Sequence, residues 1–125
     1  MTVSEAISQA EAILPGTPAP DEENDPRWQA IIAVGQFIET ESDAVWFFVS
    51  RWGDHTQADL RTAIATCLLE HLLEVDFETY FPRAALLANN SPRFADTLST
   101  CWPSDLPPQH QQSFKAYVAG WHGGA

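Results

Sequence analysis

DLRTAIATCLLEHLLEV, the stretch from Asp59 to Val75, carries the strongest helical signal in the chain. It contains no glycine or proline, and its apolar residues, with one histidine, recur at the spacing of one helical face. The residues on this face are Leu60, Ile64, Cys67, Leu68, His71, Leu72 and Val75. Four more apolar residues widen the arc beyond the stripe that a surface helix needs: Ala63, Ala65, Leu69 and Leu73. We therefore predict a buried, central helix.

His71 lies on the apolar face of this predicted helix, whereas Glu70 and Glu74 lie on its thin polar edge. We therefore expect His71 to be largely buried and the two glutamates to be solvated. Metal sites in helical bundles use a Glu-x-x-His pattern, which does not occur here. The sequence predicts neither a metal site nor a cofactor.

Composition limits the partners that the protein can have. The chain has 125 residues, 45% of them hydrophobic, which suits one globular domain over 1–125. Its formal charge is −11, so its surface repels phosphate groups, and nucleic acid and anionic membranes are poor partners. A basic protein is a good partner, because opposite charge speeds encounter. The alternative is that the acidity serves solubility alone.

Features of the chain also favour a cytoplasmic location. Cys67 and Cys101 form no metal or disulfide pattern, which fits a reducing compartment. The acidic N-terminus does not resemble a signal peptide, and no apolar run approaches the ~18 residues of a membrane span.

Periodic apolar residues predict further helices on both sides of the central one, and no stretch alternates as a strand does. We expect an N-terminal helix over 1–14, an acidic proline-rich linker over 15–26, a helical core over 27–102, and a C-terminal linker, helix and glycine-rich tail over 103–125. Gly35 lies inside a predicted helix, and close approach of a neighbouring helix would explain it. The predicted fold is all-α, with about six helices.

Three helix starts resemble one another, at Arg27, Arg61 and Arg93, with spacings of 34 and 32 residues. Helix pairs at such a period are typical of a solenoid. The segment Asp59-Leu60-Arg61-Thr62-Ala63-Ile64-Ala65 resembles a HEAT-type repeat, and 27–102 is similar to small uncharacterised bacterial proteins of HEAT-like type. The resemblance implies a short right-handed α-α superhelix. It also implies that Arg61 is structural and bonds Asp25 or Asp59, and it brings no activity.

The candidate site residues form an acidic ridge, Glu70, Glu74 and Glu78, with Trp46 or Phe47 as an apolar anchor. Trp46 to Phe48 are consecutive aromatic residues, so a helix must turn at least one of them away from its apolar face. This pattern favours a non-catalytic protein-protein interaction module, in its sharper form an inhibitor or immunity-type protein against a basic partner. Whether the protein is a monomer or a homodimer stays open.

The alternative is a small hydrolase or metal-binding enzyme that uses His55, His71 and nearby carboxylates. A closed pocket that holds two or more of these side chains would favour the enzyme, and an acidic surface would favour the binding module.

Overall fold

The computed structural model describes residues 1–16 and 25–124, with side chains described up to residue 119. Most of the predicted linker over 15–26 therefore lies outside the described residues. The helices of the described part are α1 (Val3–Ile13), α2 (Pro26–Gly35), α3 (Ser42–Trp52), α4 (Ala58–Ile64), the π-helical turn η2 (Ala65–Leu69), α5 (Glu70–Val75), α6 (Phe77–Asn90), α7 (Pro92–Thr100) and α8 (Pro108–Gly124).

Helices α4, η2 and α5 follow one another without a break and form the predicted central helix. The described residues thus form seven helices and no strand, which confirms the all-α prediction. The prediction that a glycine-rich tail follows the last helix is wrong for residues 120 to 124, because α8 continues to Gly124.

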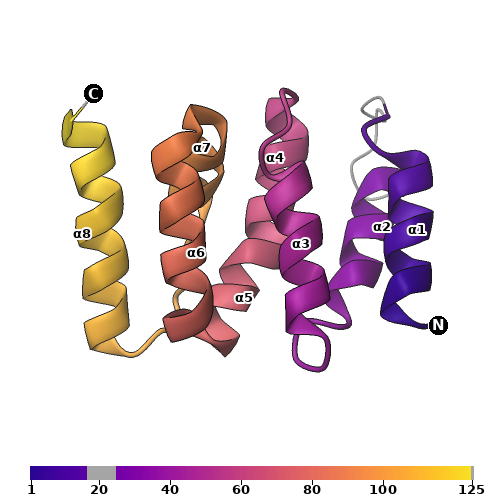
Figure 1. Ribbon diagram of the computed structural model, residues 1–125, viewed down its shortest axis with the longest axis horizontal. Coiled ribbons are helices and arrows are strands. Elements are labelled where there is room, and N and C mark those ends of the chain that lie inside the picture. The colour runs from indigo at the N-terminus through magenta and orange to yellow at the C-terminus, as the bar shows by residue number, and fades with distance from the viewer. Residues whose placement is uncertain (17–24, 125) are drawn as a thin grey trace.

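The helices stand side by side in two rows (Figure 1). The front row contains α1, α3 and α6, and the back row contains α2, the central helix and α7, while α8 closes the C-terminal end. The central helix packs against α2, α3, α6 and α7, so it touches both rows. One continuous core of buried residues extends from Ala6 in α1 to Phe114 in α8.

The π-helical turn η2 lies in the middle of the central helix. The backbone N–H of Glu70 donates to the carbonyl of Ala65, five residues back, instead of four. One extra residue in a turn rotates every following side chain by about 100° relative to a regular α-helix. Leu72 stays buried after this rotation, and Leu73 is fully buried as well.

The same rotation turns His71 and Val75 out of the core. The His71 side chain is 53% exposed, so the prediction of a buried His71 is wrong. Val75, predicted on the same apolar face, is 46% exposed.

Gly35 ends α2 directly against the π-helical turn. A Cβ atom at Gly35 would lie 3.3 Å from Cδ2 of Leu68 and 3.7 Å from the carbonyl oxygen of Cys67. The predicted close approach of a neighbouring helix is therefore confirmed, and it brings the end of α2 alongside η2.

Arg27 connects the first turn of α2 to the start of the central helix. Its Nη2 lies 3.0 Å from Oδ2 of Asp25 and 2.7 Å from Oδ2 of Asp59. The guanidinium also donates to the carbonyl of Pro15 and to Oε1 of Gln57, both at 3.3 Å. The buried guanidinium of Arg27 thus connects the chain after α1 to the starts of α2 and α4.

Arg61 makes a similar contact further along the chain. Its Nη2 lies 3.0 Å from Oδ2 of Asp96 in α7, and its Nη1 donates to the carbonyl of His55. The predicted pairing of Arg61 with Asp25 or Asp59 is therefore wrong, because Arg27 occupies both carboxylates.

Arg93, the third arginine of the series, bonds to a residue that precedes it in the chain, whereas Arg27 and Arg61 bond to carboxylates that follow them. Its Nε donates to the carbonyl of Asp54 in the turn between α3 and α4, at 2.8 Å. All three arginines therefore connect segments that are far apart in the sequence.

We expect Arg27→Met to destabilise the protein by about 3–5 kcal/mol, because it leaves Asp25, only 1% exposed, without its buried cation. Urea unfolding monitored by tryptophan fluorescence measures this change. The double variant Asp25→Asn/Arg27→Met should recover part of the loss, because it buries no unpaired charge. A loss below about 1 kcal/mol in the single variant would contradict the structural role of Arg27.

The same network predicts a sensitivity to acid. The hydrogen bond from Arg27 is the main reason that the pKa of Asp59 lies below its ordinary value of 3.8. A carboxyl with a lowered folded pKa stabilises the protein above its ordinary pKa, and this contribution is lost as the pH falls through the lowered value. Between about pH 5 and about pH 2.5, the urea midpoint should therefore fall less steeply in Asp59→Asn than in the wild type. Parallel profiles would contradict the assignment.

Candidate functional site

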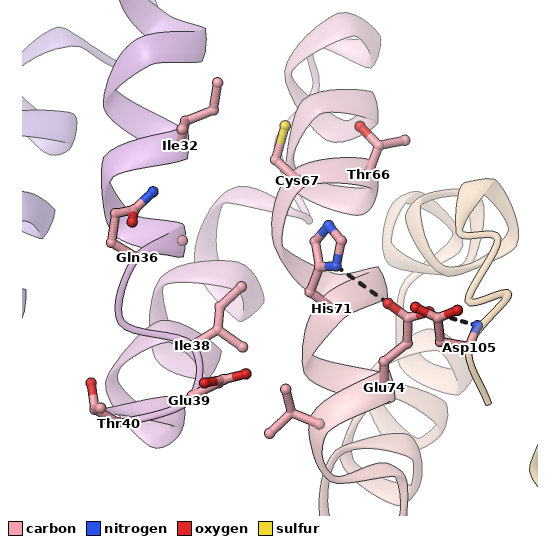
Figure 2. A pocket seen from close by; sticks show the side chains of 12 residues that line it. Ile32, Gln36, Ile38, Glu39, Thr40, Thr66, Cys67, His71, Glu74 and Asp105 are labelled. Carbon is pink, nitrogen blue, oxygen red and sulfur yellow. Dashed lines mark hydrogen bonds and ion pairs between the residues drawn. The ribbon is translucent and has the colours of Figure 1, made fainter. Parts of the chain in front are cut away.

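An open groove lies between α2, with the turn that follows it, and the helix formed by η2 and α5 (Figure 2). Its volume is about 750 Å³, within the range of ordinary ligand pockets. Asp105, in the loop between α7 and α8, lines the groove on the same side as Glu74. The π-helical turn therefore forms part of a cavity wall, and such turns are frequent at functional sites.

Carboxylates stand on both walls of this groove. Glu39 projects from the α2 side, whereas Glu74 and Asp105 project from the opposite side (Figure 2). No lysine or arginine is among the lining residues. Within the described part of the chain, the side chains of Glu39 and Asp105 have no hydrogen-bond or ion-pair partner, so their negative charge is uncompensated.

Glu74 is held in place by two contacts. Its Oε1 lies 3.3 Å from Nδ1 of His71, and its Oε2 accepts a hydrogen bond from the backbone N–H of Asp105 at 2.8 Å. These contacts bury most of its side chain, which is 14% exposed. Glu74 thus positions both His71 and the loop that carries Asp105.

The expectation that Glu70 and Glu74 are simply solvated is wrong. Glu70 Oε2 accepts from the backbone N–H of Trp102 at 3.0 Å, so both carboxylates fasten the loop after α7 to the central helix. Glu78 differs, with a side chain that is 86% exposed and lies 3.9 Å from Nε2 of His110. Of the predicted ridge, only Glu74 lines the groove.

Apolar side chains line the same groove as the carboxylates. Ile32 is 45% exposed and Val75, which was predicted on a buried face, is 46% exposed. Ile38 lines the groove as well and is largely buried. The groove therefore offers an apolar surface bordered by negative charge.

Trp46 and Phe47, the predicted apolar anchors, have opposite environments. Trp46 is 7% exposed and packs against Tyr80 and Phe94, with ring centroids 6.0 and 6.1 Å apart. It belongs to the core, so its prediction as a surface anchor is wrong. Phe47 is 68% exposed on α3 and does not line the groove.

The groove does not have the properties of a thiol-based active site. Cys67 lines it, but burial is the main factor that raises the pKa of its thiol, and the nearby Glu70 raises it further. The thiolate is the nucleophilic form, so Cys67 is a poor nucleophile at neutral pH.

The two histidines of the enzyme hypothesis have separate environments. His55 Nδ1 accepts from the backbone N–H of Gln57 at 3.1 Å, and its ring lies 5.7 Å from that of Trp52. His71 lines the groove, and His55 does not. Among residues 1–16 and 25–124, no group of three or more histidine, cysteine or acidic residues has an arrangement that would hold a metal ion.

The groove could not have been found from periodicity. Val75 was assigned to a buried face, and Glu39 and Asp105 belong to a turn and a loop that are far apart in the sequence. The one available signal was Gly35, which marks where α2 meets the central helix.

No protein-family model, curated protein or solved structure matches this chain. Within the part of the chain that the structure describes, no helix combines the length and the apolar character needed to span a membrane.

We expect Cys67 to react with iodoacetamide at neutral pH several-fold more slowly than a cysteine in a short peptide, because its raised pKa leaves less thiolate. Mass spectrometry over time measures the rate. Cys67→Ser is the control and should remain unlabelled while folded, because Cys101 is 2% exposed. Labelling of Cys67 faster than the peptide would point to an activated thiol and would favour an enzyme.

Proposed function

We propose that this protein is a non-catalytic protein-protein interaction module, and that the groove binds a basic partner protein. The observation that carries the proposal is the placement of Glu39, Glu74 and Asp105 around one groove that has no lysine or arginine in its lining. A cationic side chain in this groove would neutralise the charges of Glu39 and Asp105, whose side chains have no partner among the described residues.

The charge of the whole chain supports the same proposal. A formal charge of −11 attracts a basic protein over a distance and raises the rate of encounter, and the groove then supplies the local contact. An inhibitor or immunity-type protein against a basic toxin or enzyme is the sharper form of this proposal. A cytoplasmic location belongs to it, since both cysteines are free thiols.

The framework that we propose for this module is a HEAT-like right-handed α-α superhelix. Its support is the sequence period together with the contacts of Arg27 and Arg61, which both reach a carboxylate more than thirty residues further along the chain. An enzyme that uses His55 and His71 has less support, because only His71 lines the groove.

The proposal can be tested by charge reversal on one wall of the groove. The immobilised protein is exposed to a host extract at low and at high salt, and the basic protein that it retains is purified and titrated. Glu39→Lys should weaken binding by about tenfold, because it places like charge in the groove. Glu41→Lys makes the same charge change two residues away and outside the lining, and should weaken binding by no more than about twofold.

Two results would count against this function. Equal effects of the two substitutions would indicate general attraction to an acidic surface and not a site. Failure to retain any basic protein, at low salt as well as high, would remove the main support for the proposal.

A further inference from the structure

The groove alternates two kinds of surface that suit different parts of a ligand. Carboxylates stand on opposite walls, at Glu39 on one side and at Glu74 and Asp105 on the other (Figure 2). Exposed aliphatic surface at Ile32 and Val75 belongs to the same groove. A ligand that carries charge alone would leave this apolar surface in contact with water.

The arginines of this chain are already engaged, which disfavours a second copy as the occupant. The five arginines each lie within 4 Å of a carboxylate, in the pairs Arg27–Asp25, Arg51–Glu11, Arg61–Asp96, Arg83–Asp43 and Arg93–Asp54. Lys115, the remaining lysine or arginine, lies over the ring of Trp102 at 5.7 Å. A second copy would have to break one of these contacts to place a lysine or arginine side chain in the groove, whereas a different basic protein would not.

Basic side chains match a surface of this mixed kind. Lysine and arginine pack their methylene stems on apolar surface while the charged end stays with carboxylates or water. Basic side chains of a short segment can reach carboxylates on the two walls, and a neighbouring residue of the same segment can then contact the aliphatic surface. An aliphatic residue at that position buries apolar area, and a polar one does not.

We propose that the groove recognises a short segment of a partner protein in which one aliphatic residue is flanked by basic residues. This inference rests on the proposed function, and it adds a sequence preference to it. The groove contributes the negative charge at Glu39, Glu74 and Asp105, and Ile32 and Val75 select the central residue.

The experiment uses two synthetic peptides of equal charge, one with Arg-Leu-Arg and one with Arg-Ser-Arg at its centre, titrated into the full-length protein and followed by NMR. The wild type should bind the leucine peptide about five- to tenfold more tightly, the effect expected for burying one aliphatic side chain. Ile32→Thr should reduce this preference to about twofold or less while leaving the affinity for the serine peptide nearly unchanged.

A matched control is available in α1. Ile13→Thr makes the same substitution at an isoleucine that is 39% exposed and outside the groove, and it should keep the full preference. Glu39→Lys should weaken both peptides equally, because each carries the same charge.

The outcomes separate this inference from the proposed function. If the wild type binds both peptides equally and Glu39→Lys still weakens them, the sequence preference is wrong and the acidic binding site stands. If Ile13→Thr lowers the preference as much as Ile32→Thr, the aliphatic contact lies elsewhere and the inference is wrong. If neither peptide binds and no basic protein is retained, both proposals fail.

Discussion

One extra residue in the middle of the central helix decides which of its side chains form the core and which form the groove. The π-helical turn at Ala65–Leu69 rotates the following residues, so that Leu72 and Leu73 face inward and His71 and Val75 face the groove. In a regular α-helix, His71 would lie beside Leu72 in the core, and its imidazole would need a buried hydrogen-bond partner. The π turn therefore keeps the polar imidazole of His71 out of the core, and it supplies one wall of the candidate site.

The sequence predicted the helices well, but it predicted poorly which side chains of the central helix face the core after the π turn. The positions of helix starts follow from local chemistry, as the caps at Thr2, Asp25, Asp76 and Ser91 illustrate. The signal that reveals the π turn is more subtle. Leu60, Ile64, Leu68 and Leu72 are four residues apart at every step and all are buried. Over these three steps, a regular helix would turn them about 120° out of line, and one extra residue removes most of this drift.

The candidate site depends on tertiary contacts that no local pattern contains. Glu39 and Asp105 are separated by most of the helical core, and Asp105 reaches the groove because Glu74 accepts a hydrogen bond from its backbone N–H. Acidic residues that look alike in sequence thus have different roles. Glu70 and Glu74 fix a loop, Glu78 is solvated, and Glu39 carries unpaired charge into the groove.

The way in which the fold uses its cations connects the architecture to the proposed function. Arg27, Arg61 and Arg93 join separate helices, and each is bound to a carboxylate or a backbone carbonyl of another segment. With only six basic residues against seventeen acidic ones, this internal use leaves the acidic surplus on the surface without counter-charges. The groove is where part of that surplus borders exposed aliphatic side chains, at Ile32 and Val75. Under the proposed function, the cations that enter this groove come from a partner, because the arginines of this chain already bind carboxylates within the fold.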